Sequence, residues 1–163
     1  MQRFRRFAAG EPRTVSYKAM IRVVLDTNVI VSALLVPHGT QASVLLLALL
    51  GHIALYVSRS VLNEYEEVLR RPRLKLQPKS IDAALASIRR VAHLVEPTQT
   101  VSISSHESDN RFLECAQTAE ANYIVTGNTR HFPQRHGETR TVTGRQFLDI
   151  LAESENDPQQ GPH

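Results

Sequence analysis

Two aspartates stand at points in the sequence where a metal ion could be bound. Asp26 follows the apolar run at residues 21–25, and Asp109 stands where a helix is predicted to begin, in Ser-Asp-Asn-Arg at 108–111. A charged group directly after a buried strand loses hydration unless a positive charge meets it. Carboxylate oxygens are the ligands that Mg²⁺ and Mn²⁺ prefer, so both residues are candidate metal ligands.

Both aspartates also have a purely structural role open to them. Asp26 could cap a helix or a turn, with Thr27 and Asn28 as ordinary turn residues. Asp109 suits the start of a helix, where free backbone N–H groups and the helix dipole favour a carboxylate. The sequence around each residue does not decide between the two roles.

Three further polar residues belong to the same set of candidates. Glu64 and Glu66 border opposite edges of the apolar stripe of a helix predicted at 60–71, and helical spacing does not choose between them. Asn128 follows a strand predicted at 123–126, in Thr-Gly-Asn, although Gly-Asn is also a common turn pair.

The elements that must position these residues alternate along the chain. Short apolar runs predict strands, and helical spacing with caps and breakers predicts the segments between them. The predicted strands are 21–25, 53–57, 93–95, 123–126 and 141–142. The predicted helices are 41–50 (apolar on nearly all sides and buried), 60–71, one capped by Ser80 and containing 81–92, 110–121, and one that follows a Thr143–Gln146 capping box.

This alternation predicts an α/β fold with a mostly parallel sheet and helices on both faces. Sites in such sheets gather at the carboxyl ends of the strands, where Asp26 and Asn128 stand. We predict three segments: a flexible basic arm or upstream extension at 1–20, one domain at 21–152 and a disordered polar tail at 153–163.

Composition excludes some classes of protein and leaves others open. The chain has 163 residues, of which 42% are hydrophobic, and its one cysteine allows no internal disulfide. The net charge is +3, but residues 1–20 carry +4, so residues 21–163 carry −1 and charge alone does not identify a nucleic-acid binder. With no run long enough to span a bilayer and no secretory pattern, we predict a cytoplasmic protein.

Several common catalytic motifs are missing from the sequence. It contains no Gly-x-x-x-x-Gly-Lys phosphate loop, no Gly-x-Gly-x-x-Gly and no Gly-x-Ser-x-Gly. The seven histidines are scattered, without zinc-ligand spacing. An aspartyl-phosphate enzyme would usually have a second aspartate at position 28, where this chain has asparagine.

Three segments, in order and at matching spacing, resemble the motifs of PIN domains. VVLDTNVIVSA at 23–33 resembles their opening, SDNRFLECA at 108–116 their central acidic motif, and YIVTGNTRHF at 123–132 their fourth motif. The resemblance covers about 21–152. It is nearest to the VapC-like ribonucleases, the toxin components of type II toxin–antitoxin systems.

This resemblance implies a three-layer α/β/α sandwich and a set of site residues. Asp26, Glu64 and Asp109 would be metal ligands and, with Asn128, catalytic residues. Glu64 is selected over the other glutamate because it matches the family's middle acid, in SVLNE at 60–64. Asn128 stands where many PIN domains have Asp, which leaves one carboxylate fewer for a second ion. Thr27 would support the site by orienting Asp26 or a water.

The resemblance also implies an activity and partners. The activity would be Mg²⁺- or Mn²⁺-dependent endoribonuclease cleavage of phosphodiester bonds in RNA, and the partners a cognate antitoxin and a second copy in a homodimer, with no membrane. Arg130, His131 and Arg135, with His136, follow the fourth motif and are candidates to bind RNA. A second basic cluster, at 70–75, is an alternative, and each cluster could equally be a solvated surface.

Three other functions stay open on the sequence. Asn128 would suit a non-catalytic PIN module that binds RNA or protein. A different metal phosphoesterase, such as a structure-specific DNA nuclease, would use the same acidic residues. A protein whose main property is pairing could use the apolar helix 41–50 as its interface, although burial in its own core is the simpler use.

Overall fold

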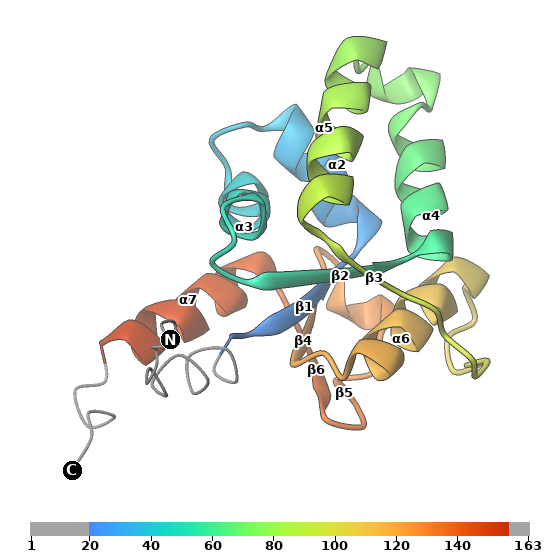
Figure 1. Ribbon diagram of the computed structural model, residues 1–163, viewed down its shortest axis with the longest axis vertical. Coiled ribbons are helices and arrows are strands. Elements are labelled where there is room, and N and C mark those ends of the chain that lie inside the picture. The colour runs from blue at the N-terminus through green and yellow to red at the C-terminus, as the bar shows by residue number, and fades with distance from the viewer. Residues whose placement is uncertain (1–19, 157–163) are drawn as a thin grey trace, which may run out of the picture.

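The structure is a computed structural model that describes residues 20–156, so residues 1–19 of the predicted arm and 157–163 of the predicted tail lie outside it. A six-stranded sheet with the order β3-β2-β1-β4-β6-β5 forms its centre (Figure 1). The strands are β1 (Arg22–Leu25), β2 (Ala54–Ser58), β3 (His93–Val95), β4 (Tyr123–Val125), β5 (Arg135–His136) and β6 (Thr139–Val142). The pairs are parallel except that of β5 with β6, which confirms the prediction of a mostly parallel sheet.

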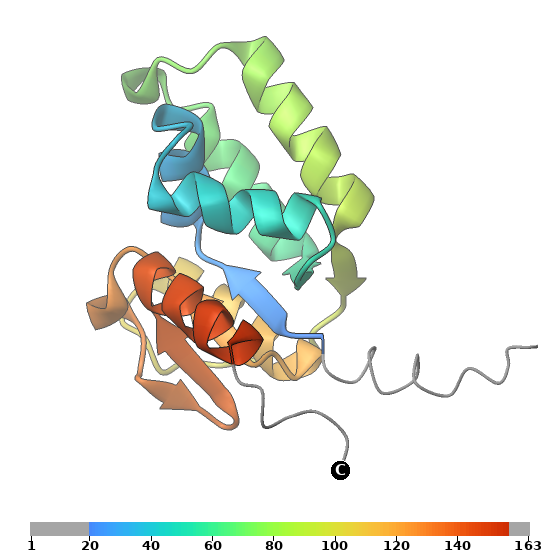
Figure 2. The same ribbon diagram turned by 90° about the vertical axis from the view of Figure 1, so that its left-hand side faces the viewer.

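Helices cover both faces of this sheet. They are α2 (Thr27–Leu35), α3 (Thr40–Leu49), α4 (Arg59–Leu69), α5 (Pro78–Val91), α6 (Glu107–Ala119) and α7 (Gly144–Glu155), with 3₁₀ turns η1 (Pro72–Leu74) and η2 (Thr129–His131). Helix α6 packs on β1 and β2 on one side, whereas α7 lies on the opposite side of the sheet and contacts α3 (Figures 1 and 2). The three-layer α/β/α arrangement is therefore confirmed.

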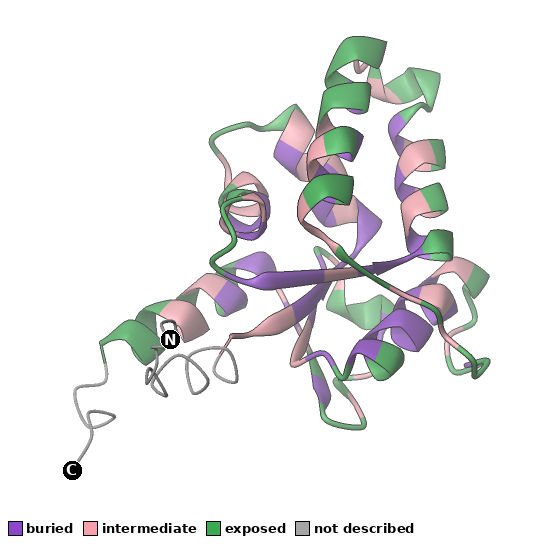
Figure 3. Ribbon diagram, in the orientation of Figure 1, coloured by how far each residue is buried: buried purple, intermediate pink, exposed green. Residues whose placement is uncertain are grey.

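The core lies between the sheet and its helices because the strands are apolar on both faces. Val23, Val24 and Leu25 of β1 are all fully buried, as expected for a central parallel strand. Helices α4 and α5 bury only one stripe each and turn their polar residues outward (Figure 3). Burial of these apolar faces holds the strands in register, and the register determines which residues stand together at the ends of the strands.

Helix α2 was not predicted from the sequence. Its residues 29–31 are Val-Ile-Val, a β-branched run that by itself favours a strand. In the structure the segment is helical, Asp26 caps it, and Val29, Ile30 and Ala33 are buried. Tertiary burial of this face has overridden local propensity, so Thr27 and Asn28 are helical residues and not turn residues.

Other boundaries differ from the predictions for local reasons. Helix α5 begins at Pro78, which suits the first helical position, so Ser80 lies inside the first turn and is not the cap. Helix α6 begins at Glu107, three residues before its predicted start. Strand β5 was not predicted because a strand of two residues is too short to show an alternating pattern. Helix α7 continues to Glu155, so residues 153–155 are helical and not part of a disordered tail.

The predicted burial of the apolar helix on all sides is wrong. Helix α3 buries Val44, Leu45 and Ala48, but Leu46 is 53% exposed, and Leu50, directly after the helix, is 62% exposed. The helix ends as predicted at Gly51, which has φ +80°. Across residues 20–156 no single helix is long and apolar enough to cross a membrane, although α2 and α3, bent by 106° between them, pass that test when taken together.

One buried hydrogen bond ties α4 to the end of β1. The fully buried Tyr65 donates its hydroxyl to the backbone carbonyl of Leu25, the residue before Asp26. We expect Tyr65→Phe to lower the free energy of unfolding by about 1–2 kcal/mol, because it leaves a buried carbonyl without this donor. Urea unfolding at neutral pH measures this.

The matched control is Tyr123→Phe. The Tyr123 hydroxyl makes no hydrogen bond within residues 20–156, and its ring packs edge-on against Phe147. This variant should leave stability within about 0.5 kcal/mol of the wild type. Equal losses in the two variants would show that the Tyr65 hydrogen bond contributes nothing specific.

Candidate active site

Asp26 lies at the junction of β1 and α2, at the carboxyl edge of the sheet. One carboxylate oxygen, Oδ1, accepts a hydrogen bond from the Thr27 backbone N–H at 2.8 Å, and Oδ2 accepts one from the Thr126 hydroxyl at 2.8 Å. The residue is only 7% exposed. Burial raises the pKa of Asp26 to about 6, against the two hydrogen bonds that lower it, and the nearby charge of Asp109 raises it further.

Strand register brings Thr126 to Asp26. Leu25 of β1 is paired with Val125 of β4, so the next residue on each strand stands at the same edge. Asn28 strengthens this junction, because its Oδ1 accepts a hydrogen bond from the Gly127 backbone N–H at 2.9 Å. The two strand ends are therefore joined by side chains as well as by the ladder.

Thr27, which was predicted to support the site, contacts Asp26 through its backbone and not through its side-chain hydroxyl. Its backbone N–H binds Asp26, but its hydroxyl is buried and has no hydrogen-bond partner among residues 20–156. The hydroxyl that orients Asp26 belongs to Thr126 instead.

Asp109 lies in the first turn of α6, two residues after the helix begins, and is also 7% exposed. It does not cap the helix, since His106 occupies the cap position. Burial raises the pKa of Asp109, while His131, His106 and a hydrogen bond from Ser104 lower it. The His131 Nδ1 atom is 3.9 Å from Asp109 Oδ2, and the Ser104 hydroxyl is 3.4 Å from that same oxygen.

Glu64 and Glu66 have different surroundings on α4. Glu66 forms ion pairs with Arg70 at 3.1 Å and Arg89 at 3.4 Å. For Glu64, burial raises the pKa first, the charges of Glu67 and Asp109 raise it further, and Arg71 lowers it. Glu64 is therefore the glutamate whose charge interacts with Asp109.

Asn128 caps η2 and links the fourth motif to Asp26. Its Oδ1 accepts from the Arg130 backbone N–H at 3.2 Å, and its Nδ2 is 3.1 Å from His131 Nε2. The Asn128 backbone N–H donates to the Thr126 hydroxyl oxygen at 3.1 Å. That hydroxyl connects Asn128 and Asp26 directly.

This arrangement supplies oxygen ligands from two acidic side chains. No group of three or more His, Cys, Asp or Glu within residues 20–156 is close enough to share one metal ion. Mg²⁺ commonly binds one or two carboxylates and keeps several waters. Asp26 and Asp109 fit that donor set, since their charges interact and no lysine or arginine is among the groups that shift either pKa.

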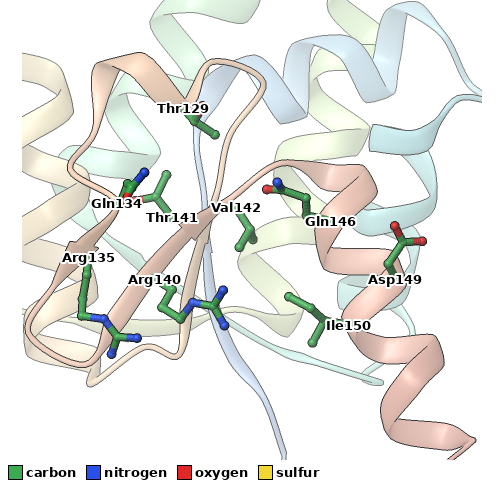
Figure 4. A pocket seen from close by; sticks show the side chains of 9 residues that line it. All are labelled: Thr129, Gln134, Arg135, Arg140, Thr141, Val142, Gln146, Asp149 and Ile150. Carbon is green, nitrogen blue, oxygen red and sulfur yellow. The ribbon is translucent and has the colours of Figure 1, made fainter.

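The predicted RNA-binding residues divide between two pockets on either side of η2. Arg130 and His131 line a pocket of about 470 Å³ next to Asp109. Arg135 lines a groove of about 580 Å³ between the β5–β6 hairpin and α7, which also contains Arg140 (Figure 4). In the alternative basic cluster, Arg70 and Arg71 already form ion pairs with acidic residues on α4 and α5.

Three residues of the site were not found from the sequence: Thr126, Ser104 and His106. Only the pairing of β1 with β4 shows that Thr126 faces Asp26. Ser104 and His106 lie in the loop before α6, in a segment with no periodic pattern. The weak signal for Thr126 was its place one residue after β4, directly before the Gly-Asn pair.

Comparison with known proteins identifies the family. The family model of the PIN domain matches residues 22–130, which include the four predicted site positions. The chain belongs to the PIN-domain family. An uncharacterised protein of Methanocaldococcus jannaschii is 32% identical over 114 residues, which are 68% of this chain and 73% of that protein.

A solved structure supports the PIN fold independently. The chain resembles one from the Rickettsia felis VapBC2 complex, which was crystallised bound to a DNA fragment from its promoter. The TM-score is 0.52 at 16% sequence identity, and the match covers 76% of this chain and 98% of that one. At this identity the match shows the fold and nothing finer.

The raised pKa of Asp26 predicts how stability depends on pH in metal-free protein. The pKa is about 6 in the folded chain against an ordinary 3.8, so the folded state binds this proton more tightly. The stability that Asp26 contributes is complete below about pH 4 and is lost as pH rises through about 6. In EDTA, Asp26→Asn should therefore raise the free energy of unfolding by roughly 3 kcal/mol at pH 7.5 and by about half as much at pH 5.

Urea unfolding at the two pH values measures this difference, with Asp149→Asn as the control. Asp149 is exposed on α7, and its replacement should have the same small effect at both pH values. If Asp26→Asn destabilised the protein at pH 7.5, or acted equally at both pH values, the pKa of Asp26 would not be raised by burial.

Proposed function

We propose that this PIN-domain protein is a metal-dependent endoribonuclease that cleaves phosphodiester bonds in RNA, and that it acts as the toxin of a toxin–antitoxin pair. The observation that carries the proposal is the meeting of Asp26 and Asp109 at the carboxyl edge of the sheet. They come from elements far apart in sequence, both are 7% exposed, and Asp109 raises the pKa of Asp26. Burying two like charges together costs stability, and a divalent cation offsets that cost.

Asp26 and Asp109 would hold one Mg²⁺ or Mn²⁺ directly, with water completing the coordination. Glu64, half-buried on α4, would act on the same ion through a water. When bound, the ion supplies a Lewis acid for the phosphate and lowers the pKa of a nearby water. This division of ligands agrees with the finding that no three acidic or imidazole groups of residues 20–156 converge on one point.

The chain's own residues fix the direction of each carboxylate. The Thr27 N–H and the Thr126 hydroxyl hold both oxygens of Asp26, which prevents its rotation away from the site. Asn128 fixes η2 through Arg130 and thereby keeps His131 beside Asp109. Preorganised donors and acceptors of this kind lower the reorganisation needed during the reaction.

The cationic residues after the fourth motif would bind the RNA backbone. Arg130 and His131 are close to Asp109, and Arg135 is farther along the hairpin, so phosphates on both sides of the cut would meet a positive side chain. In this arrangement Arg130 and Arg135 balance the negative charge that the acidic site presents to RNA.

An antitoxin and a second copy are the proposed protein partners. The structural relationship to a chain of the VapBC2 complex supports the antitoxin. The α2–α3 region exposes the apolar side chains of Leu35, Val36, Leu46 and Leu50, which would be available for contact with a partner protein. Assembly as a homodimer stays a prediction.

A non-catalytic PIN module that binds RNA or protein is the alternative function. Asn128 favours it, because an asparagine here removes one carboxylate and its side chain is engaged by Arg130 and His131. The acidic positions 26, 64 and 109 favour catalysis, since Asp109 raises the pKa of both Asp26 and Glu64 and a scaffold gains nothing from acids placed so close together.

Cleavage of a mixed pool of structured RNAs with Mn²⁺ tests the proposed activity. We expect the wild type to cleave and EDTA to abolish cleavage. Asp109→Asn should lower the rate by a factor of about 100 or more while leaving the fold intact, because it removes a charged ligand. Gel electrophoresis of the RNA and circular dichroism of the variant measure the two effects.

The matched control for this variant is Glu107→Gln. Glu107 lies on the same turn of α6, but it is exposed and paired with Arg111 at 2.7 Å. Its replacement removes the same charge and should leave cleavage within about threefold of the wild type. Wild-type cleavage by Asp109→Asn would contradict the site, and no cleavage by the folded wild type would favour the non-catalytic alternative.

Asn128→Asp tests the role of the missing fourth carboxylate. A carboxylate here can still accept from the Arg130 N–H and adds negative charge next to the Asp26–Thr126 pair. We expect Mn²⁺ to bind about tenfold more tightly, since added ligand charge strengthens hard-cation sites. Isothermal titration calorimetry measures this.

Asn122→Asp is the control, because it adds the same charge before β4, at the opposite edge of the sheet, where its side chain accepts from the Arg22 N–H. Its Mn²⁺ affinity should be unchanged. A gain of equal size in both variants would mean that net charge, and not position 128, determines the affinity.

A further inference from the structure

A pocket of about 470 Å³ opens beside the acidic site, between the loop before α6 and η2. Its lining includes Ile103, Ser104, His106, Arg130, His131 and Pro133. None of its lining residues is acidic. The chemistry of this pocket therefore differs from that of the carboxylate site next to it.

The pocket shares a wall with the acidic site. His131 stands in that wall, with Nδ1 3.9 Å from Asp109 Oδ2 and Nε2 3.1 Å from Asn128 Nδ2. The Ser104 hydroxyl lies 3.4 Å from both Asp109 Oδ2 and the backbone oxygen of His131. A group bound in the pocket would therefore lie next to a phosphate held at the proposed metal site.

The pocket is lined by apolar, imidazole and guanidinium groups. The rings of His106 and His131 lie with centroids 5.2 Å apart and tilted by 40°, and both residues are exposed. Ile103, which lines the same pocket, is 57% exposed. Arg130 adds a planar guanidinium with no ion pair to any of residues 20–156. Imidazole, guanidinium and aliphatic faces are the surfaces on which unpaired nucleobases stack.

The exposed position of Ile103 is fixed by buried hydrogen bonds. Asn110, 2% exposed, accepts from the backbone N–H groups of Ile103 and Ser104 and donates to the Ser104 carbonyl. Farther back, the buried Glu114 accepts from the Val101 N–H at 2.8 Å. The loop is held in place before any ligand arrives, so the pocket is preformed.

The groove on the other side of η2 has a different lining. It contains Arg135 and Arg140, which are paired across the β5–β6 hairpin, together with Asp149, the aliphatic Val142 and Ile150 and uncharged polar side chains (Figure 4). No aromatic or imidazole ring lines it, so it offers a base no ring on which to stack. Its two arginines can bind phosphates, as Arg130 and His131 can on the other side of η2.

We propose that the pocket formed by Ile103, His106, Arg130 and His131 binds the unpaired base of a nucleotide next to the cleaved phosphate. This inference rests on the proposed ribonuclease function, and it adds that recognition uses the face of a base. A base held in a duplex cannot enter, because its faces are already stacked.

The test compares two fluorescently labelled 12-nucleotide RNAs in fluorescence anisotropy, with Ca²⁺ in place of Mn²⁺. One strand has mixed sequence, and the other has the same backbone with abasic sugars at its six central positions. The wild type should bind the intact strand about tenfold more tightly than the abasic strand, as loss of stacking predicts. The double variant Ile103→Ala/His106→Ala should bind both strands with nearly the abasic affinity.

The control double variant is Arg135→Gln/Arg140→Gln. It should weaken binding of both strands by the same factor and so preserve the preference of the wild type for bases. All four substituted side chains are exposed, and unchanged melting temperatures would confirm that both double variants fold.

Equal wild-type affinity for the two strands, or binding to neither, would overturn the base-binding pocket. An equal loss for both strands in Ile103→Ala/His106→Ala would overturn it as well. Cleavage of the intact strand with Mn²⁺ is read separately. Cleavage without any preference for bases would support the ribonuclease function and contradict the base-binding pocket. Base-dependent binding without cleavage would support the pocket and contradict the ribonuclease function.

Discussion

The burial of the Asp26 carboxylate is the constraint on which the site depends. This group lies where β1 ends and α2 begins, and it serves both elements, because the Thr27 N–H that it accepts from is the first of α2. Its second oxygen is held by Thr126 from the neighbouring strand. A carboxyl group with a pKa of about 6 is partly protonated near neutrality unless a cation stabilises its charge. The Asp26 carboxylate thus joins two strands and a helix by hydrogen bonds, and a bound cation would stabilise its charged form.

The rest of the structure holds that carboxylate at a switch point of the sheet. The chain leaves β1 for β2 on one side, while β4 and β6 extend the sheet on the other. Crevices at such points are where open α/β sheets place their ligands. Tyr65 binds the last carbonyl of β1, and Asn28 binds the loop after β4, so both walls of the crevice are fixed by side-chain hydrogen bonds. Asp109 and Glu64 then enter from α6 and α4.

Local sequence predicted most of the architecture but not which strands are neighbours. The period of the apolar residues correctly indicated strands at β1, β2, β3, β4 and β6 and a mostly parallel sheet. It failed at α2, where burial overrides a β-branched run. Asp26, Asp109 and Asn128 were identifiable because each stands at the end or start of an element.

The partners of those residues were not identifiable, because pairing across the sheet is not encoded locally. Thr126 can donate to Asp26 only because β4 lies beside β1 in the sheet, although the two residues are 100 positions apart in the sequence. His131 was predicted as an RNA contact from its charge, but only the folded η2 turn shows that it stands against Asp109 and Asn128. The choice of Glu64 over Glu66 came from family resemblance and stays a prediction, and the ion pairs of Glu66 with Arg70 and Arg89 are consistent with it.

Anomalous diffraction from crystals of the full-length protein, grown or soaked with Mn²⁺, tests directly whether Asp26 and Asp109 share a metal ion. We expect a manganese peak within coordination distance of carboxylate oxygens from both residues, with Glu64 near enough to act through one water. Crystals that hold Mn²⁺ elsewhere on the protein, with Asp26 still bound to Thr126 and no peak between the two aspartates, would contradict it.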